Sequence, residues 1–330
     1  MTLKARSTRR GIAPVLKACA AALALVPCLV AAQAFPSKPI RAIIPFSPGG
    51  AVDVPARALG PKLQEIWGRA VVLENRPGAG GTIGAAEIAR SAPDGYNLLF
   101  VSNTHLISAA LYPNLPYDGV RDFTPIIEMG SAPNVVVVNP AVEARTLAEL
   151  FALAKAKPGE LTYASSGNGS TQHLLGAHLW SLGGVSMLHV PYKGSGPATQ
   201  DLLGGRVLVS VPGVNNVLQH IKSGKLRAIA VTSAKRSRDL LDVPSVAETF
   251  PGYEGSLWMG LLGPANMPRD LVARIHKDVS AALGSDEVKK GFVGAGFDVE
   301  IRSPEQFGRM LLSEQQRWAK TVKETGAKVD

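Results

Sequence analysis

Short apolar runs and helical patterns alternate along most of this chain, separated by turns rich in glycine, serine and proline. Runs of β-branched residues indicate buried strands, and apolar residues three and four positions apart indicate amphipathic helices. Strands are expected at residues 40–45, 71–74, 97–101, 161–164, 186–190, 207–211 and 226–232. Helices are expected at residues 52–67, 83–91, 147–156, 172–182, 198–203 and 214–223. This alternation predicts an α/β fold with mainly parallel sheets flanked by helices.

The first 34 residues have the three-part layout of a secretory signal peptide. Basic residues precede an apolar run at residues 18–32, which ends in Ala32-Gln33-Ala34. Lys17 and Pro27 make the run too short for a membrane span. We therefore expect export to the periplasm and cleavage after Ala34.

The export route is less sharply defined than the signal itself. Arg9 and Arg10 could form a twin-arginine signal, but paired arginines are ordinary in this region and general secretion is favoured. Cys28 follows Pro27 rather than the small residue that normally precedes a lipidated cysteine. Lipidation is therefore not expected.

Removal of this segment changes the net charge and the cysteine content of the chain. The formal charge of +9 falls to +4, since 30 basic and 26 acidic residues remain. Without a long basic run, the mature chain lacks the footprint of nucleic-acid binding. Both cysteines, Cys19 and Cys28, lie in the signal, so no disulfide or thiolate metal site is expected afterwards. The remaining 296 residues, in a chain with 46% hydrophobic residues, are enough for two lobes.

Three turns between an expected strand and helix carry the candidate binding chemistry. They are Ser47-Pro48-Gly49-Gly50, the segment 165–171 (Ser-Ser-Gly-Asn-Gly-Ser-Thr) and Tyr192-Lys193-Gly194-Ser195-Gly196-Pro197. Each directs free backbone N–H groups and the positive end of a helix dipole toward one point, which suits a carboxylate or phosphate. Any one of them could also be a simple helix cap. Three on the same sheet edges favour an anion site.

The catalytic and cofactor alternatives fit less well. The turn serines do not match the Gly-x-Ser-x-Gly motif of esterases, and no pair of nucleophile and base is evident. His173 and His178 are five residues apart, whereas a zinc pair on a helix needs four. The glycine-rich stretch 78–84 has Ile83 where a dinucleotide-binding motif needs its third glycine. Asp53 and Arg57 are interpreted as a local ion pair. We expect no metal, no organic cofactor and no enzymatic activity.

Several of these turns lie within longer strings that resemble one protein family. They include Ile44-Pro45-Phe46-Ser47-Pro48-Gly49-Gly50, Glu74-Asn75-Arg76-Pro77-Gly78-Ala79-Gly80-Gly81, Pro93-Asp94-Gly95-Tyr96, the stretch 163–174, His189-Val190-Pro191-Tyr192-Lys193-Gly194 and Gly224-Lys225-Leu226-Arg227-Ala228. Because these strings occur in this order along nearly the whole mature chain, the chain resembles the Bug-type solute receptors of tripartite tricarboxylate transporters.

The resemblance implies a periplasmic-binding-protein-like fold of two lobes with a ligand cleft between them. Such a receptor captures a small carboxylate without a cofactor and delivers it to the membrane permease subunits of the transporter. The matching ligand-binding positions are Phe46, Ser47, Gly50, Ala51, Thr104, Ser166, Gly169, Ser170, Thr171, Tyr192 and Lys193. Gly213, where the chain departs from the family pattern, is a further candidate. We expect a monomer that binds no nucleic acid. A receptor that reports to a signalling partner would need the same ligand-binding cleft, so this function remains an alternative. A periplasmic enzyme is a less favoured alternative.

Two departures from the family pattern bear on the ligand. Val211-Pro212-Gly213 stands where relatives usually have an acidic residue and an asparagine, and Val52 stands where threonine is common. A polar wall is therefore expected to be apolar here. This favours a ligand with a carboxylate at one end and an aromatic or otherwise apolar body.

The same resemblance sets the expected division of the chain. Lobe one comprises residues 35–134 and 252–330, and lobe two comprises residues 135–251. The chain crosses between the lobes near residues 135–138 and 245–253, which predicts the hinge. A C-terminal helix at residues 304–325, with Phe307, Met310, Leu311 and Trp318 roughly on one side, is expected to pack across lobe one.

Overall fold

Two β-sheets flanked by helices make up the described part of the chain. The structure, a computed structural model, describes residues 1–2, 35–112 and 114–328. Apart from its first two residues, the expected signal peptide lies outside this part. Lys38–Asp330 forms one compact unit, described below. Within the described residues, no helix has the length and apolar character needed to cross a membrane.

The first sheet has six strands in the order β11-β4-β10-β3-β1-β2. Its strands are β1 (Ile40–Ile44), β2 (Val71–Asn75), β3 (Asn97–Ser102), β4 (Phe123–Ala132), β10 (Leu257–Pro264) and β11 (Asp298–Arg302). Its helices are α2 (Asp53–Trp67), α3 (Thr82–Ala89), α4 (Thr104–Leu111), α9 (Arg269–Leu283), α10 (Asp286–Gly294) and α11 (Pro304–Thr325). The central strands are apolar because both faces are covered, and Ile40, Ile43 and Leu99 are fully buried.

The second sheet has five strands in the order β7-β6-β8-β5-β9. Its strands are β5 (Val135–Val138), β6 (Thr162–Ser165), β7 (Leu188–Pro191), β8 (Val209–Ser210) and β9 (Arg227–Val231). Its helices are α5 (Leu147–Ala156), α6 (Thr171–Leu182), α7 (Ser195–Leu203) and α8 (Val214–Lys222). Every helix and strand expected from the periodicity is present, although β8 is shorter and α7 begins three residues earlier than expected.

The two-lobed α/β architecture is confirmed, but both sheets are mixed rather than mainly parallel. The β1–β2, β1–β3, β6–β7 and β6–β8 pairs are parallel. The β3–β10, β4–β10, β4–β11, β5–β8 and β5–β9 pairs are antiparallel. The cause is the route of the chain. It leaves the first sheet along β4, enters the second along β5, and returns through β9 and β10, so outgoing and returning strands run in opposite directions.

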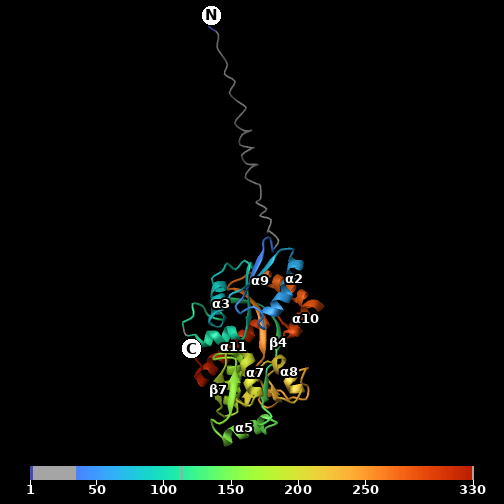
Figure 1. Cartoon of the computed structure of the whole chain (residues 1–330). Coiled ribbons are helices and arrows are strands. Elements are labelled where there is room, and N and C mark those ends of the chain that lie inside the picture. Colours follow the sequence, from blue (N-terminus) through green and yellow to red (C-terminus); the bar gives the residue numbers. More distant parts are fainter. Residues whose placement is uncertain (3–34, 113, 329–330) are drawn as a thin grey trace. The chain divides into compact units, whose positions relative to one another are not determined.

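The arrangement of the elements follows this route. In Figure 1, helices α2, α3, α9 and α10 of the first sheet (blue to teal, and orange) gather at one end of the compact unit, helices α5, α7 and α8 of the second (green to yellow) lie toward the other, and α11 lies between them. The division into lobes of residues 35–134 with 252–330 and 135–251 stays a prediction.

Helix α11 has the extent expected from the sequence, and it begins with a capping box in which Ser303 and Gln306 bond each other's backbone. Phe307, Leu311 and Trp318 are buried, and the Phe307 ring packs edge-on against Trp258 of β10. The helix contacts β4 and α4 of the first sheet, and also α6 of the second. It therefore braces the two sheets as well as covering the first.

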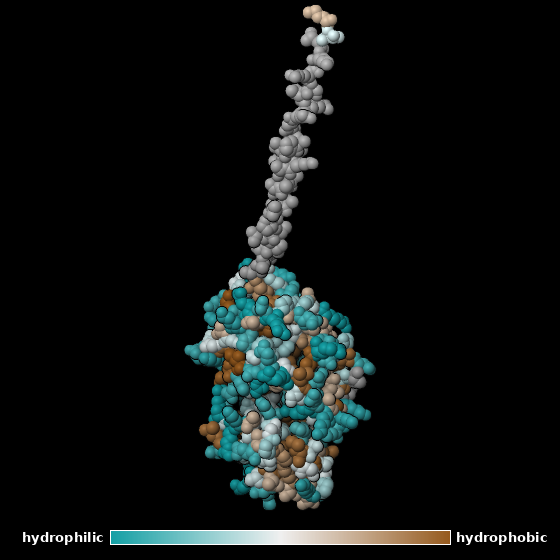
Figure 2. Space-filling model, turned by 180° about the vertical axis from the view of Figure 1, so that it is seen from behind, coloured by the Kyte–Doolittle hydropathy of each residue, from teal (hydrophilic) through white to brown (hydrophobic). Residues whose placement is uncertain are grey.

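The exposed apolar side chains are dispersed. On the face shown in Figure 2, hydrophobic residues lie among hydrophilic ones. Leu241, Leu188 and Ile83 are more than half exposed, but they lie on different elements. Apolar residues exposed singly are normal on a protein surface, so these three do not mark a binding site.

Candidate ligand-binding site

A cavity of about 710 Å³ is lined by turns from both sheets. Its walls come mainly from the carboxyl ends of β1, β2, β3, β6 and β8 and from the helices that follow them. Helices α2, α4, α6, α7 and α8 all begin at or directly after a lining residue. The first N–H groups of α4, α6 and α7 have no partner among the described residues, whereas Asp53 and Val54 of α2 donate to Gly50 and Val214 of α8 donates to Pro133. The free N–H groups and the positive dipole ends make this a favourable place for an anion.

The first wall is the turn between β1 and α2. Asp53, the first residue of α2, is 1% exposed and accepts hydrogen bonds from the Gly49 N–H, from Nε of Arg57 and from Nδ2 of Asn75, each at 2.8 Å. Asn75 also donates to the carbonyl oxygen of Phe46 at 2.9 Å. Burial alone raises the pKa of Asp53, but the bonds from Arg57, Gly49 and Asn75 hold it below its usual value. The ion pair expected between Asp53 and Arg57 is therefore part of a network that shapes the turn.

The second wall is the glycine-rich turn after β2, which contributes Pro77, Gly78, Gly80 and Gly81. This turn was not among the candidate binding turns, and the structure places it on the cavity. Gly80 lies against α4, where Ser108 Oγ donates to its carbonyl oxygen at 2.9 Å. A Cβ on Gly80 would lie 2.3 Å from that Oγ, so only glycine fits there without movement.

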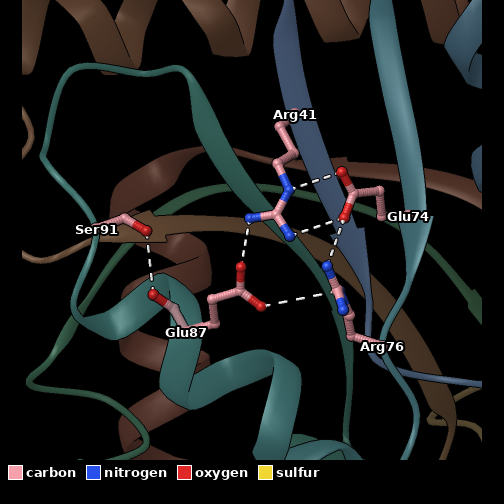
Figure 3. A network of polar contacts seen from close by, with 5 residues as sticks. All are labelled: Arg41, Glu74, Arg76, Glu87 and Ser91. Carbon is pink, nitrogen blue, oxygen red and sulfur yellow. Dashed lines mark hydrogen bonds and ion pairs between the residues drawn. The ribbon is translucent and has the colours of Figure 1, made fainter.

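A network of charged residues fixes the base of this second turn (Figure 3). Arg41 of β1 donates two hydrogen bonds to Glu74 of β2, at 2.9 and 2.8 Å, and a third to Glu87 of α3. Arg76, directly before the turn, pairs with Glu74 at 3.3 Å. Bidentate arginine–carboxylate pairs hold a defined geometry. The network therefore fixes the strands and helix on either side of the turn.

The third wall comes from the turns that precede α6 and α7. Ser170 caps α6 by accepting a hydrogen bond from the His173 N–H, and Gln172 Nε2 donates to Ser195 Oγ at 3.0 Å. Thr171 Oγ1 donates to Oδ1 of Asn103, at the start of α4, at 3.3 Å. This last bond joins the two sheets' helices across the cavity.

Two stacked imidazoles support the turn before α6 from behind. The rings of His173 and His189 are parallel within 1°, with centroids 3.8 Å apart. His173 Nδ1 accepts from the Gly169 N–H at 3.1 Å, which requires this nitrogen to be unprotonated. Burial lowers the pKa of His173 to about 4, and burial together with the charge on His173 lowers that of His189 to about 4. Both rings are therefore neutral at physiological pH.

His189 also forms a pair that the sequence analysis did not find. Its Nε2 lies 2.6 Å from Ser165 Oγ. Ser165 is fully buried, its Oγ accepts from the Gly167 N–H, and neither residue of the pair lines the cavity. The pair therefore stabilises the turn and cannot reach a ligand as a nucleophile and base.

The fourth wall surrounds the start of α8. Gly213 lines the cavity as predicted, and Asn215 and Asn216 lie beside it. The expectation of an apolar wall after residue 211 was therefore wrong at this point. Val211 is buried away from the cavity, and two carboxamides face it instead.

The described lining carries hydroxyls, carboxamides and backbone groups, but no lysine, arginine, histidine or carboxylate side chain. Phe46, Val52 and Leu257 supply apolar surface. Asn134 Oδ1 and Gln172 Oε1 are buried acceptors without a hydrogen-bond partner among the described residues, so they suit a ligand hydroxyl or a water rather than the anion itself. The site is thus suited to hold an anion through neutral donors, with room for an apolar body.

Most of the residues predicted from the sequence meet at this cavity. Those that line it are Phe46, Ser47, Gly50, Ala51, Thr104, Ser166, Ser170, Thr171 and Gly213. Gly169, Tyr192 and Lys193 are not among the described lining residues: Gly169 bonds to His173, the Tyr192 hydroxyl donates to Asp201 at 2.8 Å, and Lys193 is exposed. Contact of any of these residues with a ligand stays a prediction.

Other lining residues were missed. They are chiefly the glycine-rich turn of residues 77–81, Asn134, Gln172, Ser195, Asn215 and Asn216. The position of Asn215 and Asn216 at the start of a helix after a strand was the available signal. Asn134 had no comparable local signal, because it reaches the cavity only through the crossing between the sheets.

Comparisons with known proteins agree with this geometry. A sequence model of the family described as "Tripartite tricarboxylate transporter family receptor" matches residues 55–327. "Protein BugT" of Bordetella pertussis is 40% identical over 303 residues, which cover 91% of this chain and 93% of that protein. Among solved structures, Rpa4515 of R. palustris with adipate has a TM-score of 0.73 and 32% identity, covering 89% of this chain and 100% of that one. MatC of Rhodopseudomonas palustris with bound malate has a TM-score of 0.71 and 30% identity, covering 87% and 100%. The chain therefore belongs to the tripartite tricarboxylate transporter receptor family.

Proposed function

We propose that this protein is a periplasmic receptor that captures a small carboxylate in the cavity and delivers it, unchanged, to the membrane permease subunits of a tripartite tricarboxylate-type transporter. The observation that carries the proposal is the set of helix starts around the cavity. Five helices begin there, of which α4, α6 and α7 present N–H groups that have no partner among the described residues, and the described lining has no charged side chain to compete for the anion. Two related receptors hold adipate and malate, which are both carboxylates.

The proposal includes export and closure. A signal peptide cleaved after Ala34 would place the receptor in the periplasm, where the permease can meet it. The lobes would comprise residues 35–134 with 252–330 and residues 135–251, hinged at the two crossings. Sheet membership supports these boundaries, since β4 and β10 belong to the first sheet and β5 and β9 to the second. A ligand that contacts both lobes favours the closed arrangement.

The ligand is proposed to have a carboxylate at one end and an apolar or aromatic body. Phe46, Val52 and Leu257 offer apolar contact, while the helix starts offer the anion site. Asn215 and Asn216 add carboxamides that could bond a polar group on the same ligand. A purely apolar far wall is no longer part of the proposal.

A thermal-shift screen of the purified protein tests the function. The panel comprises mono-, di- and tricarboxylates together with aromatic acids. A ligand that binds only the folded state stabilises it, by about 2.7 kcal/mol when its concentration is one hundred times Kd. We expect a clear rise in Tm with at least one acid and full recovery of that acid afterwards. Absence of a shift with every carboxylate would contradict the anion trap, consumption of the acid would contradict the receptor role, and a shift with citrate but no aromatic acid would contradict the proposed ligand body.

A further inference from the structure

The segment between α10 and β11 touches the second sheet's lobe at two points. Asn215, in the first turn of α8, donates from Nδ2 to the carbonyl oxygen of Ala295 at 3.1 Å. Arg238, in the loop after β9, pairs with Asp298 at 2.8 Å. Residues 295–298 therefore form a contact between the lobes, here called the interlobe seat. Asn215 and Ala295 also line the cavity, so the seat lies on the cavity side of the crossings.

Gly296 is the closest point of the interlobe seat. A Cβ on this residue would lie 2.7 Å from both Cγ and Nδ2 of Asn215, and 2.9 Å from its Cβ. Contacts under 3.0 Å require one of the two sides to move. The carboxamide of Asn215 is held by its bond to Ala295, and α8 is held by the bond from the Val214 N–H to the Pro133 carbonyl at 2.9 Å. A Cβ at position 296 would therefore displace the exposed Asn215 side chain and break its bond to Ala295, unless the lobes move apart.

Gly296 also has a purely local reason to be glycine. It follows the C-terminus of α10 with φ of +87°, and the backbone bonds Gly296 N–H to Val293 and Phe297 N–H to Phe292 close the helix. A left-handed residue at this position is usually glycine in any helix. This local requirement has to be separated from the contact with Asn215 by experiment.

We propose that the contact between Asn215 and Gly296 sets how far the two lobes close, and that ligand affinity depends on it although Gly296 does not line the cavity. The inference rests on the proposed receptor function, in which both lobes hold the ligand. A side chain at position 296 acts as a wedge on the cavity side and holds the lobes apart. Apparent affinity falls in proportion to the fraction of molecules that can close.

The chain offers a matched control for Gly296→Ala. Gly68 also follows a helix of the same lobe, α2, in the left-handed region with φ of +60°, and a Cβ there would meet nothing within 4 Å. Gly68→Ala and Gly296→Ala both place alanine in the left-handed region, where the backbone penalty is larger at φ of +87° than at +60°, and only Gly296→Ala adds a collision with Asn215. Asn215→Gly removes the collision partner and completes a double-mutant cycle with Gly296→Ala.

Small-angle X-ray scattering of the ligand-free variants is the first measurement, because it needs no ligand. We expect Gly296→Ala to have a larger radius of gyration than Gly68→Ala, and Asn215→Gly/Gly296→Ala to return to the value of Asn215→Gly alone. Titration calorimetry with adipate and with malate is the second. We expect Kd to rise at least about tenfold for Gly296→Ala, which corresponds to about 1.4 kcal/mol, to stay unchanged for Gly68→Ala, and to change much less when Gly296→Ala is made on Asn215→Gly.

The outcomes distinguish a failure of the interlobe seat from a failure of the proposed receptor function. Equal scattering and equal affinity of Gly296→Ala and Gly68→Ala would overturn the interlobe seat and leave the receptor function standing. If neither acid binds the wild type, the scattering experiment alone tests the interlobe seat, and the thermal-shift panel tests the receptor function. If Gly296→Ala does not fold, the reciprocal variant Asn215→Leu, which enlarges the same contact from the other lobe, must open the molecule. An unchanged radius for that variant would refute the proposal.

Discussion

Replacing Asp53 with asparagine tests whether the buried network behind the first turn shapes the binding site. The side chain keeps its size but loses its charge and one acceptor atom. Asp53 uses both oxygens: Oδ2 accepts from Gly49 and Arg57, and Oδ1 accepts from Asn75. In Asp53→Asn one of these positions becomes an NH₂ group. It would then face another donor, and Asn75 cannot turn its amide without losing its bond to the Phe46 carbonyl.

The size of the effect follows from these contacts. A hydrogen bond to a charged group contributes about 1.5–3 kcal/mol, and a buried donor left without a partner costs about 1–3 kcal/mol. The Arg57 contribution must be discounted, because that side chain is 49% exposed and water replaces its partner. The bonds to Gly49 and Asn75 therefore dominate. We expect Asp53→Asn to lower the free energy of unfolding at pH 7 by about 2–4 kcal/mol.

Urea unfolding at pH 7 measures this loss, and the control is Glu65→Gln in the same helix. Glu65 is 69% exposed and pairs with Lys62 three residues away, so its loss should change stability by less than about 0.5 kcal/mol. Because the folded-state pKa of Asp53 is lowered, its contribution is present above the unfolded pKa and disappears as pH falls through the folded value. The difference between wild type and Asp53→Asn should accordingly shrink in acid. Equal stability of Asp53→Asn and Glu65→Gln at pH 7 would refute the reasoning.

Two further predictions concern pH. His173, whose pKa falls from 6.5 to about 4 on burial, binds its proton mainly in the unfolded state between these values, so it makes stability fall as pH drops from about 6.5 to 4. We expect His173→Asn, which keeps an acceptor near Gly169, to reduce this fall, and an unchanged slope in urea unfolding against pH would argue against it. Glu128 acts in the opposite direction: burial raises its pKa from 4.5 to about 8 despite Arg302 at 3.1 Å, so the folded state holds a proton that the unfolded state loses. Glu128 makes stability decline as pH rises from about 4.5 to 8, so the wild type should lose more stability than Glu128→Gln over this range; parallel curves would contradict the assignment.

The sequence was most informative where structure is local. The turns at residues 47–50 and 165–171 sit between a strand and a helix that are themselves visible as periodic patterns. The rule that ligands gather at the carboxyl ends of parallel strands then brings Ser47, Ser166 and Thr171 to one cavity without any knowledge of the tertiary contacts. The wall near Gly213 was misjudged because the prediction rested on Val211-Pro212-Gly213, whereas the helix that starts at Val214 places Asn215 and Asn216 on the cavity.

The strands β4, β5, β10 and β11 were not predicted. Val135–Val138 was expected only as a crossing between the lobes, and for the other three strands the reason is physical. Pro125, Glu128 and Gly130 interrupt the apolar pattern of β4, although the strand is almost wholly buried. Glu128 is tolerated there because Arg302, far away in the sequence, lies 3.1 Å from it. The pairing of β4 with β10 joins segments more than 120 residues apart. Such long-range partners leave no local pattern to read, and they are also what makes the sheets mixed.

A crystal structure of the receptor with the acid that gives the largest thermal shift tests the central claim most directly. The account predicts that a ligand carboxylate lies within hydrogen-bonding distance of backbone N–H groups or hydroxyls of the turns at residues 46–51 and 166–171, with both lobes in contact with the ligand. A carboxylate that contacts neither of these turns, or a ligand that contacts one lobe alone, would contradict it.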